Sequence, residues 1–91
     1  MISYDCMDDF DYQLRDAENS GVPITGRFDL TGDVRDYPFT EITFSNTFIK
    51  GGSFSGSIFK KCVFENTTFQ GVDLSMVNFV DCDLSSLDIV I

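Results

Sequence analysis

The side chains of this chain that could carry out chemistry are carboxylates and thiols: its 91 residues include fifteen Asp and Glu and three Cys, but no His. Without imidazole the chain lacks the usual general base and a common zinc ligand, which excludes catalytic triads, the common zinc sites and most acid–base dyads. The carboxylates and thiols form no convergent set in the sequence. We therefore expect a protein that is not an enzyme and that has no cofactor or metal.

The cysteines could have either a chemical or a structural role. Cys6, Cys62 and Cys82 are odd in number and widely spaced, which does not indicate a disulfide framework. Cys62 and Cys82 lie twenty residues apart and could form a redox pair or a metal clip, but without a CxxC motif we favour two small apolar side chains in a tight core. Asp81 and Asp83 flank Cys82, yet the repeat described below turns Cys82 inward and Asp83 outward. We discount a metal site there as well.

Charge and composition narrow the remaining classes of protein. A formal net charge of -9 disfavours direct binding to nucleic acid, because this field would repel a phosphate backbone. With 43% hydrophobic residues, ten of them Phe, the chain is too apolar for an acidic disordered segment. Its length predicts a single domain, residues 1–91, and we find neither a secretory leader nor an apolar run long enough to cross a bilayer. We expect a soluble, intracellular protein.

The second half of the chain repeats with a period of five residues. A large apolar residue occupies every fifth position without a miss, and a column of mostly small or β-branched residues lies two positions before it. Period five fits neither a helix of 3.6 residues per turn nor an alternating strand, but it fits a chain that turns a corner after every inward pair. The large apolar positions are Phe39, Phe44, Ile49, Phe54, Phe59, Phe64, Phe69, Leu74, Phe79, Leu84 and Ile89.

Three consecutive repeats resemble a known family most closely. The segments VDLSM (72–76), VNFVD (77–81) and CDLSS (82–86) follow the motif of the pentapeptide repeat family: a small residue, Asp or Asn, Leu or Phe, then two polar or small residues. The resemblance covers residues 39–91, more than half of the chain. Earlier repeats depart from the motif at its second position, which is apolar at Phe48, Ile58 and Val63.

The resemblance implies a mainly β fold, a right-handed four-sided β-helix with twenty residues per coil and the central Leu or Phe filling its axis. We expect about three coils with an N-terminal capping α-helix. Residues twenty apart then stack at about 4.8 Å, the spacing between neighbouring strands. The predicted core ladder consists of Phe44, Phe54, Phe59, Phe64, Phe69, Leu74, Phe79 and Leu84.

Residues 1–38 differ from the repeat region (39–91) in charge. They hold nine acids and three arginines, a net charge of -6, against -3 for residues 39–91. From about residue 5 to residue 19 the apolar residues fall on one side at 100° per residue, which predicts an amphipathic helix that ends before Gly21 and Pro23. We expect its apolar side to cover the N-terminal end of the β-helix through Met7, Phe10 and Leu14.

The acids of this N-terminal segment are the predicted partner-binding residues. A charge run is usually a solvated face, but acids at this density within one helix repel one another, and only Arg15 offsets them there. Asp5, Asp9 and Asp16 lie close to one line, at rises of about 6 Å and about 10 Å. The full predicted set is Asp5, Asp8, Asp9, Asp11, Asp16, Glu18, Asp29, Asp33 and Asp36.

The sequence predicts an irregular coil at the start of the repeat region and an apolar edge at its end. Residues 28–32 form a good pentapeptide centred on Leu30, but Phe39 follows nine residues later rather than ten, so we expect an irregular first coil bent around residues 33–38. The apolar C-terminal residues Leu87, Ile89 and Ile91 form a predicted dimer edge, because an unpaired end coil invites a second copy or a partner.

These features lead to one main functional hypothesis. Carboxylates spaced on a rigid narrow rod can stand in for phosphates, so the protein would block a basic DNA-binding groove by mimicking DNA. Some pentapeptide proteins are similar in this respect and engage DNA gyrase, which they protect from toxins or drugs. The small size and the unusual helix are more similar to phage inhibitors, in particular anti-CRISPR proteins that occupy the DNA-recognition subunit of a type I surveillance complex in the bacterial cytoplasm.

The main alternative is a protein-interaction scaffold in which the charge only maintains solubility. In that case the outward apolar side chains would form the contact surface for a protein partner. The sequence leaves open whether the N-terminal helix or a partner covers them. These side chains are Phe48, Ile58, Val63, Met76 and Val80.

Overall fold

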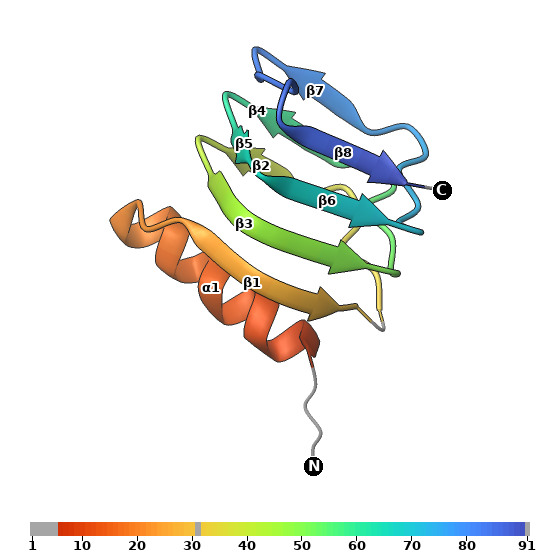
Figure 1. Cartoon of the computed structure of the whole chain (residues 1–91), viewed down its shortest axis with the longest axis horizontal. Helices are drawn as coiled ribbons and strands as arrows, with labels where there is room; N and C mark the ends of the chain where they lie inside the picture. Colours follow the sequence, from red (N-terminus) through yellow and green to blue (C-terminus); the bar gives the residue numbers. More distant parts are fainter. Residues whose placement is uncertain (1–5, 31, 91) are drawn as a thin grey trace.

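The computed structural model describes residues 6–30 and 32–90, with side chains described from residue 9 onward. Within these residues one helix is followed by eight short strands (Figure 1). No helix in this part of the chain is long and apolar enough to span a membrane. The elements are α1 Cys6–Ser20, β1 Ile24–Asp29, β2 Pro38–Thr40, β3 Thr43–Lys50, β4 Ile58–Lys60, β5 Val63–Glu65, β6 Thr67–Gln70, β7 Asn78–Val80 and β8 Leu87–Val90.

The strands form a parallel β-solenoid of about three coils. One sheet has the order β1-β3-β6-β8 with β5 beside β3, and a second has the order β2-β4-β7. From β2 onward every pair joins residues twenty apart, as in Phe39 with Phe59 and Phe59 with Phe79. Isolated bridges such as Ser53 to Asp73 complete the remaining side of the coil. The predicted four-sided architecture, mainly β with an N-terminal helix, is therefore confirmed.

Stacked phenylalanine rings fill the axis of the solenoid. The rings of Phe39 and Phe59 are 4.5 Å apart and inclined by 6°, and those of Phe44 and Phe64 are 5.1 Å apart and inclined by 10°. Phe59 continues its stack to Phe79 at 5.2 Å. Of the predicted ladder, the residues that are at most 2% exposed are Phe44, Phe54, Phe59, Phe64 and Phe69.

Burial decreases along the predicted ladder toward β8. Leu74 and Phe79 are half-buried, and Leu84 is 39% exposed. The placement of Leu84 in the core is therefore wrong. It belongs to the last described coil, and no described residue stacks on its far side, so only one neighbouring coil shields it.

The coil turns at every fifth residue. From residue 36 to residue 81 each fifth residue has a positive φ, whereas residues other than Gly and Asn rarely adopt this left-handed conformation. The predicted corner after each inward pair is confirmed, and it recurs whatever the residue type. The corner residues are Asp36, Glu41, Asn46, Gly51, Gly56, Lys61, Asn66, Gly71, Met76 and Asp81.

The small inward column links successive coils by side-chain hydrogen bonds. Thr47 donates its hydroxyl to the carbonyl of Ile24 at 2.8 Å, twenty-three residues earlier, and the Cys62 thiol donates to the carbonyl of Phe39 at 3.4 Å. The same interval recurs for Ser57, Thr67 and Cys82. Every buried side-chain nitrogen or oxygen of the described residues has a hydrogen-bond partner. Cys62 and Cys82 are free thiols that pack like the hydroxyls of this column, as the core interpretation predicted.

The first coil departs from the regular register differently than we expected. Phe28, not Leu30, pairs with Ile49, and the offset between β1 and β3 changes from twenty residues at Ile24 to twenty-one from Gly26 onward. Asp33 already pairs at the regular interval of twenty, so residues 33–38 stack in register. The placement of Leu30 at the centre of a repeat is therefore wrong. The inward side chains of β1, Ile24 and Phe28, are four residues apart, whereas Phe44 and Ile49 of β3, with which they pair, are five residues apart.

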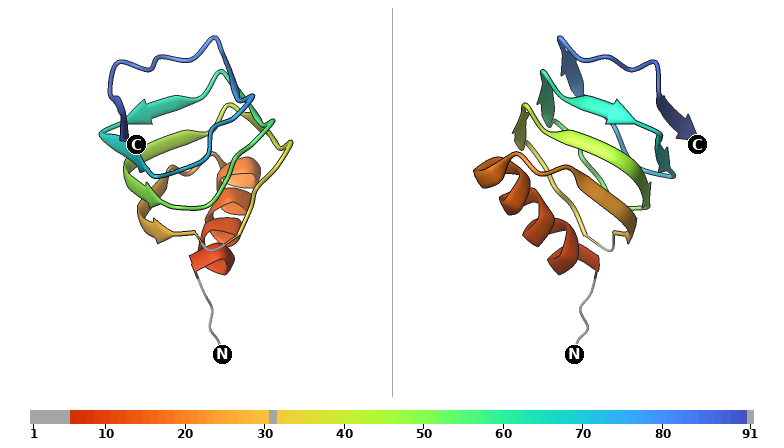
Figure 2. Two further views of the ribbon diagram at one scale, coloured as in Figure 1. Left: turned by 90° about the vertical axis from the view of Figure 1, so that its right-hand side faces the viewer. Right: turned by 60° about the vertical axis from the view of Figure 1, so that its left-hand side comes forward.

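Helix α1 covers the N-terminal end of the solenoid (Figure 2). Phe10, 1% exposed, packs against Phe28 with ring centroids 5.5 Å apart and against Phe54 at 6.0 Å. Leu14 and Ala17 are buried beside it, whereas the side chain of Met7 lies outside the described residues. The end of the helix is marked by a hydrogen bond from the Gly21 N–H to the carbonyl of Ala17, at 2.9 Å.

Candidate acidic interaction face

The outward side of α1 carries two rows of carboxylates. At 100° per residue, Asp9 and Asp16 fall in one row and Asp11 and Glu18 in the other, and within each row the two acids are separated by a rise of about 10 Å. Tyr12, 74% exposed, lies between the rows. All four carboxylate residues are exposed to solvent. We call Asp9, Asp11, Tyr12, Asp16 and Glu18 the α1 acidic face.

The two rows differ in their local partners. Asp11 forms an exposed ion pair with Arg15 at 3.7 Å, and Glu18 accepts a hydrogen bond from the Tyr37 hydroxyl. Within the described part of the chain, neither Asp9 nor Asp16 forms an ion pair. Exposed pairs such as Asp11–Arg15 contribute little to stability. The free row is therefore the stronger candidate for contact with a partner.

The remaining predicted acids do not all join this face. Asp5 and the side chain of Asp8 lie outside the described residues. Asp29 pairs in the ladder with Lys50 on one side of the coil, and Asp33 lies on another side with its carboxylate 3.2 Å from Arg35. The solenoid therefore places Asp29 and Asp33 on different sides of the coil, and their membership of one binding set stays a prediction.

Tyr37 anchors the end of α1 to the first coil, and sequence analysis missed it. The hydrogen bond that its hydroxyl donates to Glu18, together with partial burial and the negative charge of that carboxylate, raises the pKa of Tyr37 to about 12. A second contact joins the same two elements, because the side-chain oxygen of Gln13 accepts the backbone N–H of Thr25 at 3.0 Å. These contacts fix the orientation of the acidic face, and no spacing in the sequence signals them.

The raised pKa values of Tyr37 and Cys62 predict that the folded state loses stability at alkaline pH. Burial raises the pKa of the Cys62 thiol to about 11, and Tyr37 titrates near 12. Both values exceed those of the unfolded chain, so their contribution to stability is complete below pH 9 and is lost as pH rises from 9 to 12. We expect the urea midpoint, measured in reductant, to fall across this range. In the Tyr37→Phe variant the fall above pH 10 should be smaller, and an identical profile would contradict the assignment.

Two other aspartates, Asp73 and Asp83, serve the local backbone. Asp73 accepts hydrogen bonds from the hydroxyl and the N–H of Ser75, and Asp83 accepts from the N–H of Ser85 at 3.0 Å. These bonds hold the pKa of both carboxyl groups below the usual range. They are turn-forming acids of the repeat rather than members of a site. Within the described ranges no group of three or more Cys, Asp or Glu side chains could hold a metal ion.

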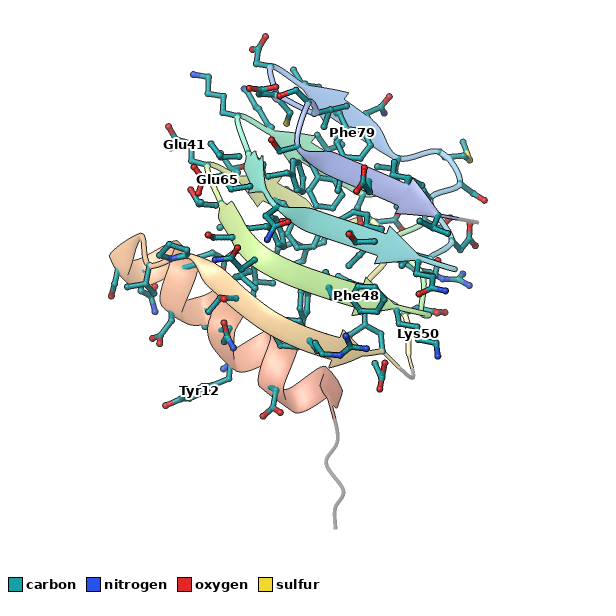
Figure 3. The ribbon with its side chains drawn as sticks, viewed as in Figure 1. Tyr12, Glu41, Phe48, Lys50, Glu65 and Phe79 are labelled. Carbon is teal, nitrogen blue, oxygen red and sulfur yellow. The ribbon has the colours of Figure 1, made fainter. Side chains whose placement is uncertain are left out.

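The outward apolar side chains are divided among sides of the coil. Phe48 is half-buried beneath the guanidinium of Arg27, which lies 4.5 Å from the centre of its ring (Figure 3 labels Phe48). Ile58 is 43% exposed and Val63 is 40% exposed, and they belong to different sheets. Helix α1 lies at the N-terminal end of the solenoid and does not cover β4 or β5 (Figure 1). Phe48 is therefore covered by Arg27 of the neighbouring strand β1 and not by helix α1.

The predicted dimer edge is only partly described. Leu87 is half-buried, Ile89 is 50% exposed, and Ile91 lies outside the described residues. Val90, 46% exposed, adds to the apolar surface of β8. Pairing of two copies through this edge stays a prediction.

The fold and the acidic face together define a helix-capped parallel β-solenoid with carboxylates on the outward side of its helix. Residues 53–85 match the family of pentapeptide repeats (8 copies). This match and the solenoid together support the pentapeptide repeat family, within which proteins of this architecture are expected to act by protein interaction. Comparisons with curated proteins and with solved structures gave no match.

Proposed function

We propose that this protein is an interaction module whose α1 acidic face binds the basic DNA-binding surface of a partner and so competes with DNA. The observation that carries the proposal is the charge on the outward side of α1. There the structure describes four exposed carboxylates and one cation, Arg15, which pairs with Asp11. Phe10, Leu14 and Ala17 anchor the opposite side of the helix, so the carboxylates are presented on a fixed scaffold.

The electrostatic argument is one of competition. B-DNA carries about one negative charge per 1.7 Å of its axis, and a groove lined with Lys and Arg to accept that charge also attracts a spaced row of carboxylates. The longest extent of the molecule is 38 Å, close to the roughly 34–36 Å of one turn of DNA. The protein therefore fits one groove contact rather than a long saddle.

This size favours a particular kind of target. The DNA-recognition subunit of a type I CRISPR surveillance complex suits a compact inhibitor better than the DNA gyrase saddle that longer pentapeptide rods fill. The protein would then be a phage anti-CRISPR inhibitor acting in the bacterial cytoplasm, with gyrase as the alternative target. The proposal requires no catalysis, metal or cofactor.

The test is displacement of labelled DNA from a purified type I surveillance complex and from purified gyrase, at low and at high salt. We expect displacement that weakens steeply with salt, and at least a tenfold loss of potency for the double variant Asp9→Lys/Asp16→Lys. The matched control Glu65→Lys/Asp88→Lys changes the net charge equally but lies on the coils away from α1, and it should retain most of the potency.

Other outcomes discriminate between the alternatives. Equal losses in both double variants would show that only net charge matters and would contradict a specific face. Partner binding that is insensitive to salt and to both double variants, but is abolished by Ile58→Asp, would favour the scaffold hypothesis. That second candidate is supported by Ile58, Val63 and Val80, each at least 40% exposed on regular strands.

A further inference from the structure

Tyr12 is the one large aromatic side chain on the described part of the α1 acidic face, and nothing in the fold requires it. Its side chain is 74% exposed and projects from α1 away from the solenoid (Figure 3). An exposed polar residue would serve the helix equally well, because helix propensity differs little between these residue types. Exposed tyrosines of this kind are typical of contact surfaces, where a large ring with few rotatable bonds loses little entropy on binding.

Carboxylates flank the Tyr12 ring along the helix. Asp9 precedes it by three residues and Asp16 follows it by four, so both lie on neighbouring positions of the same helix surface. Arg15, three residues after Tyr12, is the cation of the helix closest in sequence, but its guanidinium is directed to Asp11. The described contact between a cation and a ring in this protein involves Arg27 and Phe48, not Tyr12. The ring of Tyr12 is therefore open to a cation from outside.

We infer that the α1 acidic face receives an arginine side chain of its partner, with the guanidinium stacked on the ring of Tyr12 and its edge hydrogen-bonded to Asp9 or Asp16. Charge complementarity selects a basic partner, and the combination of a ring with adjacent carboxylates selects arginine over lysine. A guanidinium is planar, stacks on aromatic faces and offers several donors to carboxylates at once, whereas an ammonium group is a compact, strongly hydrated charge. This inference rests on the proposed function and specifies the chemistry of its contact.

The experiment uses the full chain and two ten-residue peptides, one alternating Gly and Arg and one alternating Gly and Lys, each with a fluorescent label. Binding is measured by anisotropy at low salt. We expect the arginine peptide to bind about threefold more tightly than the lysine peptide, because a guanidinium stacks on the ring and bonds to a carboxylate at the same time. Tyr12→Leu should remove this preference, and Tyr12→Phe should retain it. Asp9→Lys/Asp16→Lys should weaken binding of both peptides.

The inference is overturned if the two peptides bind equally, if neither binds, or if Tyr12→Leu keeps the preference for arginine. Tyr12 is exposed, so its variants should fold, and circular dichroism checks this directly. The outcomes also separate this inference from the proposed function. Displacement of DNA that is sensitive to Asp9 and Asp16 but not to Tyr12 would overturn only the arginine contact. Arginine preference without displacement of DNA from either complex would overturn only the proposed target.

Discussion

Replacing Phe59 with Ala is expected to destabilise the protein by about 3–5 kcal/mol, the range for large-to-small changes of buried aromatic residues. Phe59 is fully buried and lies in the middle of the axial stack, 4.5 Å from the ring of Phe39 and 5.2 Å from that of Phe79. It also meets the edge of Phe54 at 5.8 Å. The rings on both sides belong to other coils, so the resulting cavity would weaken two inter-coil contacts at once.

The measurement is the free energy of unfolding from urea titration. Phe79→Ala is the matched control, because Phe79 occupies the same stack but is only half-buried. It should cost clearly less than Phe59→Ala. Since small domains are stable by only about 5–15 kcal/mol, the Phe59 variant should show a much lower midpoint or unfold at physiological temperature. Equal losses in the two variants would contradict the description of an axial core that loosens toward β8.

The second large effect is expected at Gly52. Its φ is +76°, which a residue with a Cβ adopts only with strain. A Cβ at this position would also lie 2.7 Å from the Cβ of Leu30 and 2.9 Å from the carbonyl oxygen of Gly32. Adding the backbone cost of about 1–2 kcal/mol to an overpacking cost of about 1–3 kcal/mol, we expect Gly52→Ala to destabilise the protein by about 2–5 kcal/mol.

Gly71 provides the control for this prediction. It has a φ of +64°, but an added Cβ would meet no atom within 4 Å. Gly71→Ala should therefore show the backbone cost alone, about 1–2 kcal/mol. The difference between the two variants in urea unfolding isolates the close contacts of Gly52 with Leu30 and Gly32. If Gly52→Ala costs no more than Gly71→Ala, the close approach of the first coil to the second is not as described.

Much of the fold could be predicted because the period of the repeat is also the period of the structure. Each inward Phe is followed by a corner, so ladders such as Phe39, Phe59 and Phe79 can be written from the sequence. The first coil could not be predicted in the same way. Leu30 follows Asp29 as the motif requires, yet it is Phe28 that packing against β3 aligns with Ile49.

The candidate site was predictable only in part. Charge density identified Asp9 and Asp16 on one side of a helix, because helical periodicity is a local property. The contact of Glu18 with Tyr37 and that of Arg27 with Phe48 join segments that are nineteen and twenty-one residues apart. Such contacts depend on the register between coils, which the charge pattern does not contain.

The constant stacking interval has a consequence for the dimensions of the molecule. Because residues twenty apart lie on the same side, adding twenty residues at a corner would return every following side chain to its original direction. The only change would be a displacement of about 4.8 Å along the axis. The distance between the helical cap and the last coil can therefore be changed in steps of one coil while the orientation of the side chains on each side is kept.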